Sequence, residues 1–150
     1  ALQEKGIFHD FVQDNQSKST YGVLRGLHFQ NPPHSQAKLI RALSGSILDV
    51  AVDIRKSSDT YGQHFSMELS DKNKKQLLIP RGFAHGFVVL SETAEIIYKC
   101  DNFYHKEAEG GFVFNDPAFN IDWKIPADDM ILSEKDQKYP SFSNFTSKFD

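Results

Sequence analysis

The sequence predicts an all-β protein, a barrel or sandwich of short strands with helical segments only near its ends. Thirteen Phe, five Tyr and one Trp supply the flat, stiff side chains that favour pleated surfaces. Short apolar stretches recur between turn residues at the spacing of an all-β fold. No long stretch shows the period of an amphipathic helix, so a helical protein is disfavoured.

The strongest strand prediction is for residues 47–55, where apolar and polar side chains alternate. Val50 and Val52 point one way, and Asp49 and Asp53 point the other. One face of this strand is therefore polar. It faces either solvent or, if the sheet closes into a barrel, an interior site.

Further strands are expected later in the chain, each bounded by Ser, Asp, Asn, Gly or Pro. They cover residues 64–69, 76–79, 86–90 and 94–100. Helical segments are expected only at residues 1–5 and 133–138, the second capped by Ser133. Without a repeat or a linker, the 150 residues fit a single domain, 1–150, which needs neither cofactor nor disulfide for its size.

Composition argues against several classes of function. The net charge is -3 and the basic residues are scattered, so neither nucleic acid nor an anionic membrane is an expected partner. No apolar run is long enough to span a bilayer and no signal peptide is recognisable, which favours a soluble protein. The single Cys100 excludes an intrachain disulfide and a Cys-based zinc cluster, so we expect a cytoplasmic location.

Chemistry is first suggested by residues 21–30, which hold Arg25 and His28 among glycines and bulky apolar residues. An imidazole in a cavity can act as a proton-transfer base, and a nearby guanidinium can hold an anion. The alternative is a buried structural histidine. Strand parity places the two side chains on opposite faces, unless a bulge near Gly26 or a dimer-related site brings them together.

His85 is a second candidate, on the same predicted face as Phe83 and Phe87. It is either a buried structural residue or a partner of His28 in one cavity. No His-x-His pair is present, which makes a metal centre less favoured than proton transfer.

Three further residues have two interpretations each. Lys38 opens an apolar strand and is either solvated or turned inward to stabilise an oxyanion. Tyr98 either packs beside Ile96 or donates a proton. Asp136, next to Lys135, has the composition of an exposed charge pair.

Short motifs along nearly the whole chain, in order, resemble the dTDP-4-dehydrorhamnose 3,5-epimerase family of RmlC-like cupins. They are residues 11–15, 22–30, 36–41, 48–55, 79–87, 98–99, 115–117, 121–123 and 132–136. The resemblance implies a cupin jelly-roll barrel that works as a homodimer, without metal or other cofactor, on a nucleotide-linked 4-keto-6-deoxyhexose. Proteins of the family usually have a further amino-terminal segment that contributes to phosphate binding. We expect it to be missing from this sequence, either because the sequence is trimmed or because the protein binds its nucleotide differently.

By motif position, the resemblance makes His28 the base, Asp136 the residue that orients it, and Tyr98 the acid. Lys38 then stabilises the enolate. The substrate contacts implied by the resemblance are Gln13, Asp14, Asn15, Arg25, Lys38, His85, Glu109 and Lys135.

The expected activity is isomerisation, with inversion at C3, at C5 or at both. A single-carbon epimerase, a 3,4-ketoisomerase and a non-catalytic sugar-nucleotide-binding barrel are the alternatives. A metal-dependent oxygenase of the same fold is the least favoured.

Overall fold

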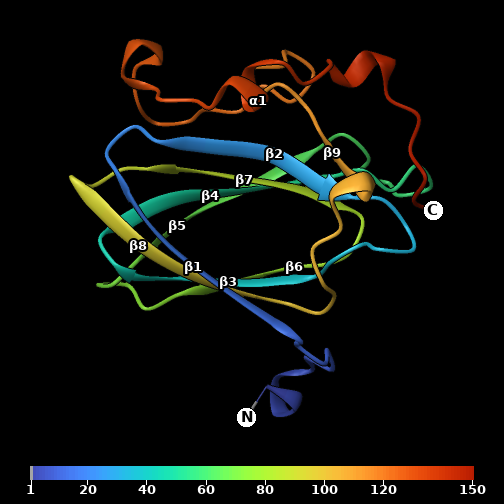
Figure 1. Cartoon of the computed structure of the whole chain (residues 1–150), viewed down its shortest axis with the longest axis horizontal. Helices are drawn as coiled ribbons and strands as arrows, with labels where there is room; N and C mark the ends of the chain where they lie inside the picture. Colours follow the sequence, from blue (N-terminus) through green and yellow to red (C-terminus); the bar gives the residue numbers. More distant parts are fainter. Residues whose placement is uncertain (1) are drawn as a thin grey trace.

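The computed structural model describes residues 2–150, which form two antiparallel sheets that face each other (Figure 1). One sheet has the strand order β1-β8-β3-β6 and the other β5-β4-β7-β2-β9. The first eight strands are thus divided equally between two layers of four, and β9 extends the second layer, as in a jelly roll. The all-β prediction is confirmed.

The strand bounds agree closely with most of the predicted stretches. They are β1 (Gln13–Thr20), β2 (Leu24–Gln30), β3 (Lys38–Ser44), β4 (Ser46–Asp53), β5 (His64–Ser70), β6 (Gln76–Ile79), β7 (Phe83–Val89), β8 (Thr93–Cys100) and β9 (Glu109–Gly111). Short 3-10 helices cover Gln3–Lys5, Lys106–Ala108, Ala127–Asp129 and Phe142–Asn144, and α1 covers Glu134–Gln137. Both predicted helical segments are present, although Ala1 lies outside the described residues.

The central strands of the five-stranded sheet, β4 and β7, are buried on both faces. The inner face of the sheet packs against the other sheet through a core that includes Ile47, Ala51 and Phe87. Its outer face, with Val50 and Val52, is covered by the carboxy-terminal part of the chain (Figure 1). The polar face predicted for β4 therefore looks into the barrel, and solvent reaches neither face.

The carboxy-terminal segment, residues 112–149, is held on this outer face by aromatic rings. Phe112 is fully buried, and its ring lies 4.8 Å from that of Phe145 and 5.3 Å from those of Phe29 and Phe142, between centroids. Aromatic pairs in edge-to-face or tilted contact stabilise a fold by more than the apolar area that they bury would account for. They fix the segment that carries α1 over β2.

A bulge in β2 determines which side chains enter the barrel. The register with β7 shifts between Arg25 and His28. Gly26 lies at the shift with φ +128, and a Cβ there would be 2.5 Å from the Gly86 Cα. Only glycine fits this conformation and this close approach. The bulge considered from the sequence is thus present. It places Arg25 and His28 on the same face of β2, so no dimer-related site is needed to bring them together.

Candidate active site

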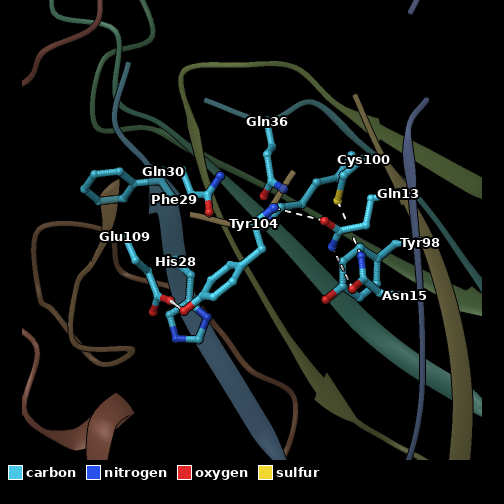
Figure 2. A pocket seen from close by; sticks show the side chains of 11 residues that line it. Gln13, Asn15, His28, Phe29, Gln30, Gln36, Tyr98, Cys100, Tyr104 and Glu109 are labelled. Carbon is cyan, nitrogen blue, oxygen red and sulfur yellow. Dashed lines mark hydrogen bonds between the residues drawn. The ribbon is translucent and has the colours of Figure 1, made fainter. Parts of the chain in front are cut away.

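An open cavity of about 150 Å³ lies between the two sheets. Its wall comes from the start of β1 and β3, the end of β2 and β8, and the loop before β9. The lining residues are Gln13, Asn15, His28, Phe29, Gln30, Gln36, Lys38, Tyr98, Cys100, Tyr104 and Glu109 (Figure 2).

His28 is held by a carboxylate from the far end of the chain. Its Nε2 is hydrogen-bonded to Oδ1 of Asp136, which is 1% exposed. Asp136 also accepts hydrogen bonds from the Ser133 hydroxyl at 2.9 Å and from the backbone N–H of Gly26. Because an ionised carboxylate only accepts, His28 donates from Nε2, and its Nδ1 is left as the proton acceptor.

The pKa of Asp136 supports this assignment. Burial alone would raise it, but the hydrogen bonds from His28, Ser133 and the Gly26 N–H bring the pKa below its usual value. Asp136 is therefore ionised at neutral pH. Its interpretation as an exposed charge pair with Lys135 was wrong, because the Ser133 cap turns the carboxylate inward and Lys135 instead pairs with Glu109.

Tyr98 faces His28 across the cavity. It projects from β8 in the four-stranded sheet, while His28 projects from β2 in the opposite sheet (Figure 2). Burial raises the pKa of Tyr98, an effect to which Cys100 adds and which the charge of Arg25 partly offsets. The phenol is therefore protonated at neutral pH and can donate.

Lys38 brings a cation to the same cavity. It is half-buried at the start of β3. Burial lowers its pKa, and this is opposed by Cys100, Asp49 and Glu109. Within residues 2–150 its ammonium makes neither a hydrogen bond nor an ion pair, so its donors can bind a ligand oxygen.

Beside His28, a second imidazole is paired with a carboxylate. His85 is the cross-strand partner of His28, and its Nε2 lies 2.6 Å from Oδ1 of Asp49. Asp49 is fully buried, and its Oδ2 has no hydrogen-bond partner among the described residues. Burial lowers the pKa of His85, which keeps the ring neutral at neutral pH. His85 does not itself line the cavity.

The predicted substrate contacts differ in where the structure places them. Gln13 and Asn15 line the cavity, whereas Asp14 points outward and pairs with Lys99 at 2.8 Å. Arg25 is exposed, with its charge close enough to act on Tyr98. Glu109 and Lys135 are bound to each other.

Glu109 is the centre of a cluster that the sequence did not reveal. Its two carboxylate oxygens accept hydrogen bonds from the hydroxyls of Tyr104 and Tyr139, both at 2.7 Å. Lys135 pairs with the same carboxylate. No spacing signal pointed to either tyrosine, since 30 residues separate Tyr139 from Glu109.

The sequence and the fold are both similar to those of known proteins. Residues 1–144 match the family model described as dTDP-4-dehydrorhamnose 3,5-epimerase. The chain belongs to this family. Members of the dTDP-4-dehydrorhamnose 3,5-epimerase family are isomerases, and the expected fold and family are both confirmed.

Individual relatives agree with the family assignment. The dTDP-4-dehydrorhamnose 3,5-epimerase of Shigella flexneri is 56% identical over 127 residues, which is 85% of this chain and 69% of the relative. The crystal structure of the enzyme of that name from Elizabethkingia anophelis NUHP1 has a TM-score of 0.91 at 61% identity, and the match covers 95% of this chain and 78% of that one. The epimerase RmlC from Legionella pneumophila Philadelphia 1, in complex with dTDP-4-keto-L-rhamnose, has a TM-score of 0.91 at 46% identity. The match covers 97% of this chain and 76% of that one.

Among residues 2–150, no three His, Cys, Asp or Glu side chains are grouped as metal ligands would be. None of the helices in the same residues has the length and hydrophobicity needed to cross a bilayer.

The Glu109 cluster predicts a measurable pH dependence of stability. Burial would raise the pKa of Glu109, but hydrogen bonds from Lys135, Tyr104 and Tyr139 lower it from 4.5 to about 2. A carboxyl group with a lowered pKa stabilises the fold above pH 4.5, and this stabilisation is lost as the pH falls from 4.5 toward 2. We expect Glu109→Gln to be less stable than wild type at neutral pH, with a difference that shrinks in acid.

Urea unfolding at a series of pH values from 7 to 3 measures this difference. Glu92→Gln is the matched control, because Glu92 is an exposed residue in the turn before β8. It should keep the wild-type pH profile. A Glu109→Gln deficit that stays constant down to pH 3 would contradict the assignment.

Proposed function

We propose that this protein inverts C3 and C5 of a dTDP-linked 4-keto-6-deoxyhexose through an enolate intermediate. The observation that carries the proposal is the placement of His28, with its Asp136 partner, opposite Tyr98 across one cavity. The family assignment and the Legionella complex with dTDP-4-keto-L-rhamnose support the substrate class.

Removal of a proton next to the C4 ketone begins the reaction. The hydrogens on C3 and C5 are acidic because the resulting carbanion is delocalised onto the C4 oxygen. His28 takes the proton at Nδ1, and Asp136 stabilises the imidazolium that forms. Lys38 donates to the C4 oxygen as it gains negative charge.

Inversion then requires a proton from the opposite face of the carbon. A single group could return the proton only to the face from which it came. Tyr98 provides the second group, because it lies on the opposite wall and its raised pKa keeps its proton in place. With one catalytic group on each sheet, a proton can leave one face of the carbon and another can arrive at the opposite face, as inversion requires.

Substrate binding is assigned to the polar residues around the cavity. Gln13, Asn15 and Arg25 are proposed to hold the nucleotide diphosphate and orient the sugar. Contacts of substrate with Asp14, His85, Glu109 and Lys135 stay predictions. The free thiol of Cys100, which lines the cavity, supports a reducing cytoplasmic location.

Solvent deuterium exchange tests the function and separates the two proton-transfer roles. In heavy water, wild type should incorporate deuterium at C3 and C5 of the 4-keto substrate and yield the doubly inverted sugar. His28→Asn should abolish exchange at both carbons, because no base remains. Tyr98→Phe should still exchange while inversion slows by roughly 100-fold to 10,000-fold, since only reprotonation is impaired.

Matched controls are available on other parts of the barrel. His64 and Tyr61 lie outside the cavity lining, so the variants His64→Asn and Tyr61→Phe should behave as wild type. No exchange by the folded wild-type protein would defeat the proposal. Product stereochemistry, read by NMR, identifies inversion of one carbon or ketone migration, and either result would replace 3,5-epimerisation. Tight binding without turnover, unchanged in His28→Asn, would indicate a binding protein.

The cation assigned to the enolate has its own test. Lys38→Met keeps a similar chain length and removes the charge, so kcat should fall by roughly 100-fold to 1,000-fold. Lys56→Met is the control, because Lys56 is exposed outside the cavity and pairs with Asp150. Steady-state kinetics of the two variants would show a selective loss for Lys38, and an equal loss in both would contradict its role.

A homodimer is part of the same proposal. An apolar hollow of about 230 Å³ on the outer face of the four-stranded sheet, lined by Leu2, Leu39 and Ile97 among others, supports it. Sedimentation equilibrium should give twice the chain mass of 17.1 kDa. A single-chain mass at micromolar concentration would contradict the dimer.

A further inference from the structure

The imidazole of His28 has a second neighbour from the carboxy-terminal segment. The ring of Tyr139 lies 5.4 Å from the His28 ring between centroids, at an interplanar angle of 58°. This is within the usual range for an aromatic pair in contact. His28 is therefore contacted at Nε2 by Asp136 and on its ring by Tyr139, only three residues further along the chain.

A missing side chain makes room for this contact. Gly111 of β9 is the cross-strand partner of His28. A Cβ at Gly111 would lie 2.8 Å from two ring atoms of Tyr139. Any larger residue at this position would push the Tyr139 ring away, so the glycine gives the tyrosine its place beside the base.

The hydroxyl of Tyr139 anchors the ring from its other end. It donates to Oε1 of Glu109 at 2.7 Å, and the Glu109 side chain is only 12% exposed. Burial raises the pKa of Tyr139, and the hydrogen bond and charge of Glu109 raise it further, so the hydroxyl stays a donor. The ring is thus fixed by a hydrogen bond at one end and by the backbone at the other.

We propose that Tyr139 is a positioning residue that holds the His28 ring in the orientation needed for proton abstraction. A single hydrogen bond to Asp136 fixes the Nε2 atom but leaves the ring free to pivot about it. Contact with the Tyr139 ring removes this freedom and directs Nδ1 into the cavity. Tyr139 is not among the cavity-lining residues, so it acts through His28 and not through substrate.

This inference rests on the proposed function, because it concerns the base of that reaction. A small displacement of a catalytic group can lower a rate by about 100-fold. Loss of the Tyr139 ring should therefore reduce kcat and leave substrate binding nearly unchanged. An aromatic ring without the hydroxyl should preserve most of the rate.

The experiment compares Tyr139→Leu and Tyr139→Phe in the deuterium-exchange assay. We expect kcat of Tyr139→Leu to fall by about 10-fold to 100-fold while KM changes by less than about two-fold. Tyr139→Phe should keep kcat within about three-fold of wild type, because the ring remains against His28. Tyr61→Leu is the matched control, since it removes a tyrosine ring that packs on Phe142 away from the cavity, and it should keep both constants.

Each other outcome would overturn the inference. It would be overturned if Tyr139→Leu kept the wild-type kcat, or if its KM changed by as large a factor as its kcat. It would also be overturned if Tyr139→Phe were as defective as Tyr139→Leu. If Tyr139→Leu does not fold, Tyr139→Met fills similar space without a flat ring and should show the same selective loss of kcat. A wild-type protein that exchanges no deuterium would refute the proposed function itself, whereas normal exchange in both wild type and Tyr139→Leu would refute only the role of Tyr139.

Discussion

The bulge at Gly26 is the constraint on which the candidate site depends. In a regular strand, Arg25 and His28 would lie on opposite faces of β2. The extra residue brings the exposed Arg25 and the half-buried His28 to the same face of β2 and leaves Leu27 and Phe29 in the outer core. It also turns the Gly26 N–H toward Asp136. One backbone irregularity, possible only without a Cβ, thus brings Arg25 and His28 to one face of β2 and holds Asp136 beside His28.

The two sheets contribute differently to this site. The five-stranded sheet is covered on both faces along its central strands β4 and β7, so it supplies a rigid wall that carries His28 and the buried pair of His85 with Asp49. The four-stranded sheet supplies Tyr98 and Lys38 from strand ends near the open side of the cavity. Polar groups buried in the first wall cost free energy unless they are paired, and the apolar layers on either side offset that cost.

Much of this arrangement could be predicted from residue patterns, and the failures have physical causes. The alternation of β4 and the Ser133 cap were recognised because each signal is local. The strand β1 was missed because all eight of its residues are polar, and its inward side chains line a cavity instead of a core. Asp136 looked exposed, and Tyr139 gave no signal at all, because their partners are distant in sequence, 108 residues away for His28 and Asp136. Before the fold was known, only the ordered family motifs linked Asp136 to His28.

The carboxy-terminal segment completes the apolar core through Phe142 and Phe145 and also brings Asp136 and Tyr139 into contact with His28. One segment therefore supplies both the hydrophobic cover and the two neighbours of this ring. During synthesis from the amino end, the barrel strands leave the ribosome first, and the nascent chain has no paired His28 until residues 133–139 have followed. Pairing of His28 with Asp136 therefore cannot precede synthesis of residues 133–139, so no shorter chain made from the amino end holds both members of this pair.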